Sequence, residues 1–226
     1  MRSGSPWPGA ILALALVACA SPPTESLAQH DCPTAAPTAG EATAILAEAQ
    51  RAVVATSQGS FTIELDPASA PIATANFVAL ARCDFYAGIT FHRIIAGFVA
   101  QAGDPGTRTK RGPFEELGSG GPGYQFEVEF PSESQPYERY TVAMANAMQY
   151  DNITGEISSG RDTNGSQIFI DLADLPQLRP YYSVIGKVTE GTDVVDAIGA
   201  VAVNNSQDGV PVDPVIIQSI EVNSGS

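Results

Sequence analysis

The stretch FHRIIAGFVAQAGD, residues 91–104, decides the interpretation of this chain. Its apolar and β-branched residues are typical of two short strands. Alternation along the first strand places Arg93 on the same side as Phe91 and Ile95, and His92 on the opposite side. Burying an arginine costs free energy unless it has partners, so Arg93 taken alone is interpreted as a surface residue whose stem covers apolar neighbours. The rest of the chain changes that interpretation.

The chain on both sides of this stretch predicts a β-rich body. Short apolar or alternating runs are typical of strands at 52–56, 61–65, 91–95, 98–102, 124–130, 141–145, 167–172, 182–189 and 215–222. Apolar residues at helical spacing predict helices at 71–81 and 193–200, with a short helix at 42–50. Roughly eight short strands and two main helices favour a closed or sandwiched antiparallel β body.

Composition narrows the classes of protein. The chain has 226 residues, enough for one domain with an appendage. Its 25 Asp and Glu against 11 Lys and Arg give a formal net charge of −14. Such a surface repels phosphate backbones, so we expect no nucleic-acid partner. Two His and three Cys without a CxxC pair argue against most zinc modules, and we expect neither a metal nor a cofactor.

The N-terminal residues are typical of an export signal rather than of a folded body. Arg2 precedes an apolar run at 9–18 that is too short for a membrane span and ends at Cys19. The ending LVAC resembles the bacterial lipoprotein signal, in which this cysteine carries the lipid. The alternative is an ordinary cleaved signal with an incidental cysteine. We therefore expect a signal peptide at 1–18 and a protein anchored to a bacterial membrane, outside the cytoplasm, through Cys19.

The sequence after the signal predicts a tether. Residues 19–50 are rich in Pro, Thr and Ala, a composition that does not build a core, so the folded domain is expected to span 51–226. With Cys19 lipidated, Cys32 and Cys83 remain. Export would place them in an oxidising compartment, where a disulfide between them would pin the tether to the body. The alternative is two unrelated thiols.

Four further blocks accompany the first stretch in a fixed order. They are GSGGPGY at 118–124, AMANA at 143–147, TNGSQIFI at 163–170 and IGKV at 185–188. Together with residues 91–104, these blocks closely resemble the cyclophilins, a family of peptidyl-prolyl cis-trans isomerases. The resemblance covers about residues 51–224, nearly the whole body of the chain.

The resemblance implies a fold and a site. The fold is mainly β, a closed eight-stranded antiparallel barrel with two capping helices, and the substrate groove lies on its outside. By position within the matching blocks, Arg93 is the catalytic residue. The residues implied in substrate binding are His92, Phe98, Val99, Gln101, Ala145, Asn146, Gln167, Phe169, Leu178 and Tyr182. The proline pocket among them consists of Phe98, Val99, Phe169 and Leu178.

The chemistry that the resemblance implies needs no nucleophile, metal or cofactor. Isomerising an X-Pro bond crosses a barrier of about 18–20 kcal/mol because amide resonance is lost, and the proline nitrogen of the twisted transition state gains a lone pair. A fixed cationic donor such as Arg93 stabilises that state more than the planar ground state. We expect the partners to be proline-containing peptides and unfolded exported proteins, and the protein to be a monomer.

Two other classes of function are alternatives to the isomerase: a non-catalytic binding module and a hydrolase. A cyclophilin fold can hold proline-containing partners, or serve as a chaperone, without catalysis. The presence of Arg93, Phe98 and Gln101 favours the enzyme over that binding module. A hydrolase that uses His92 would need a nucleophile elbow, which the sequence lacks.

The chain departs from the family pattern in several places. Ala96 stands where the family usually has Pro, and the only Trp lies in the signal segment, so weak binding of cyclosporin-type ligands is expected. The segments 103–123 and 148–163 are longer than the compact family pattern and adjoin the groove. The second contains the acidic residues Asp151, Glu156 and Asp162. It is interpreted as a solvated loop, with a calcium or partner site as the alternative.

Overall fold

The computed structural model describes residues 1, 31–110, 112, 116–132, 137–205 and 207–224. Apart from Met1, the predicted signal peptide at 1–18 lies outside these residues, and so does Cys19. Within the described residues, no helix is both long and apolar enough to cross a membrane.

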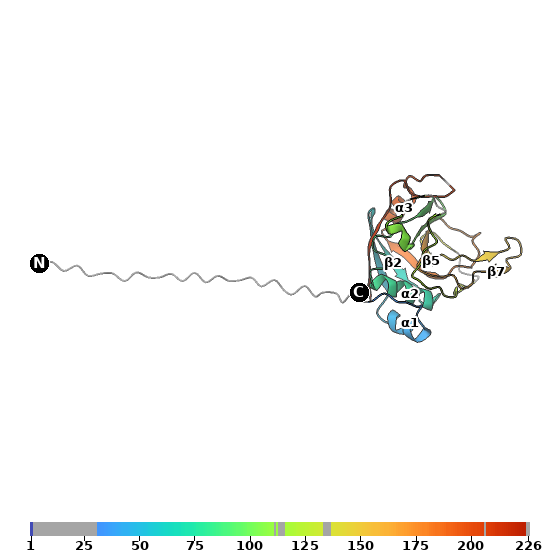
Figure 1. The fold of residues 1–226 in the computed structure, drawn as a ribbon, viewed down its shortest axis with the longest axis horizontal. Helices are drawn as coiled ribbons and strands as arrows, with labels where there is room; N and C mark the ends of the chain where they lie inside the picture. The colour runs from blue at the N-terminus through green and yellow to red at the C-terminus, as the bar shows by residue number, and fades with distance from the viewer. Residues whose placement is uncertain (2–30, 111, 113–115, 133–136, 206, 225–226) are drawn as a thin grey trace.

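Among the described residues, eight antiparallel strands form one sheet, which curls into a half-barrel (Figure 1). The strands are β1 (Arg51–Thr56), β2 (Gly59–Leu65), β3 (Arg93–Ile95), β4 (Val99–Ala102), β5 (Thr141–Met144), β8 (Ile168–Asp171), β9 (Val184–Glu190) and β10 (Ile217–Asn223). Their order across the sheet is β10-β1-β2-β9-β5-β8-β4-β3. Along β1 every second residue is buried, which confirms the two-residue period that predicted a hairpin there.

The sheet is not the closed barrel that the sequence predicted. Its edge strands among the described residues are β3 and β10. The segments beside them meet only at an isolated bridge, Thr90 to Ile216, and at neighbouring backbone hydrogen bonds such as that from the Phe91 N–H to the Val215 carbonyl. The loop before β10 explains the gap in the ladder. The N–H of Ile94 in β3 donates to the carbonyl oxygen of Gly209 at 2.7 Å, so this loop occupies the position where a paired strand would lie. Gly209 has φ of 68°, and a Cβ there would lie 2.4 Å from the Ile94 carbonyl oxygen.

Three α-helices are present among the described residues: the two that the barrel pattern implied, and the short helix predicted at 42–50, which spans Ala39–Leu46. They are α1 (Ala39–Leu46), α2 (Pro71–Arg82) and α3 (Thr192–Gly199), and a 3-10 turn, η1 (Pro105–Arg108), follows β4. Figure 1 shows α1 and α2 side by side at one end of the sheet and α3 at the other. Helix α1 begins with a capping box between Thr38 and Glu41, and the guanidinium of Arg82 in α2 donates to the carbonyl of Ile45.

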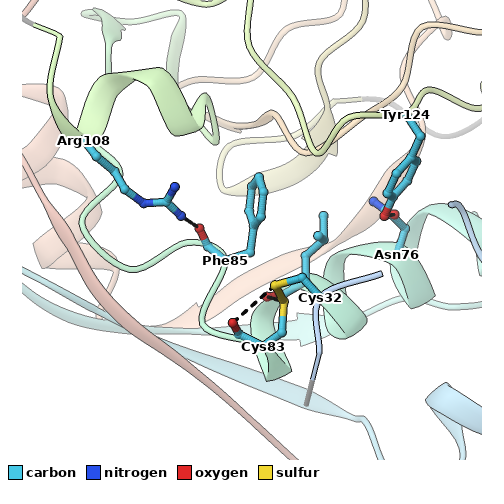
Figure 2. Close-up of a disulfide and its surroundings, with 7 residues drawn as sticks. Cys32, Asn76, Cys83, Phe85, Arg108 and Tyr124 are labelled. Atoms are coloured by element: carbon cyan, nitrogen blue, oxygen red, sulfur yellow. Dashed lines mark hydrogen bonds between the residues drawn. A yellow bond between two sulfur atoms is a disulfide. The ribbon is translucent and has the colours of Figure 1, made fainter. Parts of the chain in front are cut away.

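A disulfide joins Cys32 to Cys83 (Figure 2). These are the two cysteines for which the sequence predicted a disulfide, with two unrelated thiols as the alternative. Cys83 is the C-cap residue of α2, so the bond ties the segment before α1 to the end of this helix. In the same region the Arg108 guanidinium of η1 donates to the carbonyl oxygen of Phe85 and lies over its ring. These contacts fix the chain that leaves α2.

The strand predicted at 124–130 is replaced by an extended segment with one bridge, Phe126 to Asn164. Side-chain anchors hold this segment together with a few backbone hydrogen bonds to residues 161–164. The Tyr124 hydroxyl donates to Oδ1 of Asn76 in α2 at 2.7 Å (Figure 2). The Glu129 carboxylate accepts from the N–H groups of Ile72 and Ala73, at 3.1 and 2.8 Å. The N-cap residue of α2 makes no side-chain hydrogen bond to the first turn of the helix. The Glu129 carboxylate therefore caps this helix N-terminus from a distant segment.

Two apolar clusters lie on opposite faces of the sheet. The larger cluster contains Ile168 and Ile170 together with the buried residues of α2, such as Phe77. Phe169, between the two isoleucines, belongs to a smaller cluster with Val99. Because neighbouring residues of a strand point to opposite faces, the smaller cluster marks the outer face, where the candidate site lies.

Candidate active site

The register of three strands brings the predicted site residues into one row. Arg93 on β3 is paired with Gln101 on β4, and Gln101 is paired with Phe169 on β8. Paired residues of an antiparallel sheet point to the same face, so all three side chains lie on the outer face. The alternation that placed Arg93 apart from His92 in the sequence therefore also places Arg93 at the site.

A surface pocket of about 370 Å³ lies over this row. Its lining residues are Arg93, Phe98, Val99, Gln101, Ala145, Asn146, Tyr150, Phe169, Leu178 and Tyr182. All of them except Tyr150 were implied by the resemblance. The pocket thus collects residues from β3, β4, the turn between them, β8, and the segments after β5 and β8.

The floor of the pocket is apolar and tightly held. Val99 and Phe169 are only 4% and 5% exposed. The Tyr182 ring stands edge-on to Phe169, with ring centroids 5.2 Å apart. Leu178 packs against the same cluster. Such a floor suits a small apolar ring, because these side chains offer few hydrogen-bond partners to a polar group.

The Arg93 guanidinium lies at the side of this floor. Its central carbon is 5.7 Å from the centroid of the Phe98 ring. Burial lowers the pKa of Arg93 from its usual value, and the nearby Tyr182 phenol opposes the shift. An arginine starts from so high a pKa that it stays charged at neutral pH. The site therefore combines an apolar pocket with a permanent cationic donor.

A chain of amide hydrogen bonds connects Gln101 to the glycine-rich segment. The Gln101 Nε2 donates to Oε1 of Gln167 at 2.9 Å. The Gln167 Nε2 donates to the carbonyls of Gly118 and Gly120, at 2.7 and 2.8 Å. Gln167 lines a neighbouring hollow of about 440 Å³ rather than the pocket itself. The two hollows share Gln101 and the segment after β5, so they adjoin each other.

The segment after β5 forms the edge between the two hollows. The Ala145 N–H donates to the carbonyl of Gln167 at 2.8 Å. The side chain of Asn146 has a positioning function: its Nδ2 donates to the Tyr181 carbonyl at 2.8 Å, and its Oδ1 accepts from the Met148 N–H at 3.1 Å. Asn146 thus fixes the two segments that flank the pocket against each other.

His92 does not line the pocket. It is 1% exposed and lines a different hollow with Lys110 and Leu117. Burial lowers the pKa of His92 to about 4, although the nearby Asp104 carboxylate opposes the shift. Neither ring nitrogen has a hydrogen-bond partner among the described residues. His92 is therefore a neutral core histidine, on the opposite side of its strand from Arg93.

Three residues near the site were missed by the sequence analysis. Tyr150 lines the pocket from the long second loop. Tyr137 is buried in the outer cluster and binds the backbone of Tyr182. Asp171 is fully buried at the end of β8, and burial raises the pKa of its carboxyl to about 8. No motif marks them, because the surroundings of each depend on how distant segments pack in the folded chain.

The acidic second loop does not gather its carboxylates. Asp151 is used within its own turn, where Oδ1 accepts from the N–H groups of Ile153 and Thr154 at 2.8 and 2.6 Å. These bonds lower the pKa of Asp151. Over the part of the chain that the structure describes, no group of three or more His, Cys, Asp or Glu is placed to hold a metal ion.

Comparison with known proteins agrees with this fold and pocket. Residues 51–222 match the family model described as cyclophilin type peptidyl-prolyl cis-trans isomerase/CLD. A peptidyl-prolyl cis-trans isomerase of Helicobacter pylori is 40% identical over 156 residues, which cover 68% of this chain and 82% of that protein. Peptidyl-prolyl cis-trans isomerase A of Mycobacterium tuberculosis is 37% identical over 189 residues, which cover 76% of this chain and 91% of that protein.

Solved structures show the same likeness. A crystal structure of a Cryptosporidium parvum cyclophilin type isomerase matches with a TM-score of 0.65 and 28% identity, covering 79% of this chain and 99% of that one. A second crystal structure of that isomerase, in the presence of the dipeptide Ala-Pro, matches with a TM-score of 0.64 and 30% identity, over 78% of this chain and all of that one.

The half-barrel and its outer pocket therefore define a member of the cyclophilin-type family. Within that family, this chain is a peptidyl-prolyl cis-trans isomerase.

Proposed function

We propose that the pocket binds the proline ring of a peptide and that Arg93 is the catalytic residue. The observation that carries this proposal is the position of the Arg93 guanidinium beside an apolar floor of Val99 and Phe169. A proline ring on that floor brings the nitrogen of its peptide bond towards the guanidinium. The likeness to an isomerase crystallised in the presence of Ala-Pro supports proline-containing peptides as substrates.

Arg93 acts on the charge that develops during rotation. As the X-Pro bond twists, amide resonance is lost and the nitrogen gains a lone pair that can accept a hydrogen bond. The planar amide nitrogen has no such lone pair to offer. A fixed arginine N–H therefore binds the transition state more strongly than the ground state, and the difference lowers the barrier.

The glutamines keep the peptide in place without weakening the arginine. Gln101 lines the pocket, and Gln167 holds its amide group in position. Both are neutral, so neither competes with the substrate for the positive charge of Arg93. The edge formed by Ala145 and Asn146 offers backbone groups along which an extended peptide can lie.

We further propose that the protein is a lipoprotein that acts on newly exported proteins. The support is the apolar run at 9–18 ending in LVAC, which resembles a lipoprotein signal. The disulfide between Cys32 and Cys83 agrees with an oxidising compartment. Mass spectrometry of the chain purified from bacterial membranes tests this: acyl chains on Cys19 are expected, and a Cys19→Ser variant should lack them and leave the membrane.

The catalytic proposal is tested by isomerisation of an X-Pro peptide with the purified chain, Arg93→Ala and Arg93→Lys. We expect strong catalysis by the unaltered chain, its loss on Arg93→Ala, and partial recovery at most with Arg93→Lys, which keeps the charge but not the planar donor fork. Peptide affinity is measured beside the rate. Equal near-background rates in all three, with peptide binding retained, would instead show a binding module.

A further inference from the structure

The long second loop folds into a hairpin that reaches the active site. Strands β6 (Gln149–Tyr150) and β7 (Ile157–Ser159) pair with each other and not with the main sheet. In Figure 1 this hairpin is the yellow arm marked β7 that stands out from the half-barrel. Tyr150, at the end of β6, nevertheless lines the pocket. The hairpin of residues 149–159 thus has one residue at the site and the rest outside it.

Specific contacts hold the hairpin against the segment that carries Tyr182. The Tyr181 hydroxyl donates to the Gly155 carbonyl at 2.6 Å. The Arg179 Nη2 donates to the carbonyls of Asn152 and Ile153, at 2.9 and 3.3 Å. The rings of Tyr150 and Tyr181 meet edge to face, with centroids 5.0 Å apart. Hydrogen bonds at the turn and a ring contact at the base fix its orientation.

The packing at Gly155 shows how closely the hairpin is docked. Gly155 has φ of 76°, a conformation that other L-residues rarely adopt. A Cβ at this position would lie 2.5 Å from Nη1 of Arg179 and 2.9 Å from the Tyr181 hydroxyl oxygen. Both atoms are the ends of side chains that hold the turn, so a Cβ at position 155 would move them and weaken their hydrogen bonds to the hairpin.

Tyr150 lies at the rim of the pocket rather than on its floor. Val99 and Phe169, on the floor, are almost fully buried, whereas Tyr150 is half-buried. On the same side stands Tyr182, whose pKa is raised by burial and by the neighbouring Tyr150 phenol. Two neighbouring phenol rings therefore line one side of the pocket. The next group of a bound peptide to meet these rings is a side chain adjacent to the proline.

We propose that Tyr150 is a specificity-determining residue, whose ring contacts the substrate side chain adjacent to the proline and favours an aromatic or large apolar residue there. This inference rests on the proposed function, since it assumes that the pocket takes the proline. It assigns to the hairpin a role in choosing the sequence around the proline, separate from the role of Arg93 in the reaction.

Two series of proline peptides test the inference, one varying the residue before the proline and the other the residue after it. Alanine, leucine and phenylalanine are compared at each position, by calorimetric Kd and by kcat and KM. In one series the unaltered chain should prefer phenylalanine to alanine by about three- to tenfold, the range of one aromatic contact. Tyr150→Ala should lose this preference through Kd and KM, with kcat retained, whereas Tyr150→Phe should keep it.

Two further variants separate contact from general stability. Ile153→Ser alters the turn at a side chain that is 91% exposed and should leave the preference unchanged. Gly155→Ala disturbs the Arg179 and Tyr181 contacts that hold the turn and should weaken the preference. An unaltered chain with no preference in either series, or a preference that survives Tyr150→Ala, overturns the inference. So does a uniform loss of kcat with every peptide. Because Kd is measured directly, a chain that binds without catalysing tests the inference even if the catalytic proposal fails.

Discussion

The hydroxyl of Tyr137 binds both polar backbone groups of Tyr182. It accepts from the Tyr182 N–H at 3.0 Å and donates to the Tyr182 carbonyl at 3.0 Å. The Tyr137 ring also stands edge-on to the Tyr182 ring, with centroids 6.2 Å apart. Since Tyr182 forms part of the pocket wall and Tyr137 is 2% exposed, a buried phenol sets the position of a residue at the active site.

Replacing Tyr137 with Phe should lower both stability and activity. The change keeps the ring but leaves two partly buried backbone groups of Tyr182 without their partner, which costs about 1–3 kcal/mol. We expect a several-fold fall in kcat/KM because the pocket wall is no longer fixed. Denaturant unfolding and peptide kinetics measure the two effects. Tyr140→Phe is the matched control, because that hydroxyl binds Asp196 at the surface and its loss should change little.

Replacing Gln101 with Glu should inhibit the enzyme at neutral pH. Gln101 is the register partner of Arg93 and lines the same pocket, so a carboxylate there would pair with the guanidinium and compete with the substrate. A fall in kcat/KM on the order of tenfold or more is expected from the lost transition-state stabilisation. Activity should begin to recover below about pH 4, where a Glu side chain is protonated. Gln101→Met keeps the length without the charge; if it is as inactive as the Glu variant at pH 7, the electrostatic explanation is wrong.

The buried carboxyl of Asp171 should make stability depend on pH. Both oxygens lack a hydrogen-bond partner among the described residues, and burial raises the pKa of Asp171 from 3.8 to about 8. Between these two values the native state holds one more proton than the unfolded state. The free energy of unfolding should therefore fall as pH rises from about 4 to about 8, by at most about 1.4 kcal/mol per pH unit from this group.

The Asp171→Asn variant removes that titration. We expect its stability relative to the unaltered chain to increase as pH rises through this window, so that the variant is the more stable protein at pH 8. Urea unfolding at a series of pH values checks the sign. Parallel stability curves for the two proteins would show that Asp171 does not titrate in this range.

Breaking the disulfide should destabilise the protein without altering the site. The bond joins residues 51 positions apart, and the chain-entropy model gives about 4 kcal/mol for a loop of that length. It ends at the C-cap of α2, a helix that contributes no residue to the pocket. The Cys32→Ser, Cys83→Ser double variant should have a lower Tm and an unchanged kcat/KM at 25 °C. A large loss of activity at a temperature where the variant is folded would contradict this.

The elements that the sequence predicted well have a strong local period. The β1–β2 hairpin and α2 follow from alternating and helical spacing, and they lie close to the predicted bounds. The segment 124–130 has the composition of a strand, yet Glu129 and Tyr124 are used to anchor α2 instead. Closure of the barrel was predicted wrongly, because the loop around Gly209 rather than a strand pairs with Ile94.

Most of the candidate site could be predicted because its residues stand in contiguous blocks with a fixed spacing. Arg93, Gln101 and Phe169 meet at one place because the strands that carry them pair in register. His92 was the exception among these blocks, since strand alternation turns it into the core while its neighbour faces the pocket. Tyr150 could not be predicted at all, because it lies in a loop without a motif.

The sequence by itself therefore determined the family, the outer row of site residues and the chemistry that Arg93 can supply. These properties reside in residue type and spacing along single strands, which the order of amino acids fixes directly. Only the tertiary structure decided that Tyr150 reaches the pocket, that Tyr137 holds Tyr182, and that the buried Asp171 carboxyl has no hydrogen-bond partner among the described residues. These depend on contacts between segments distant in the chain, and on the exclusion of water that follows when those segments pack together.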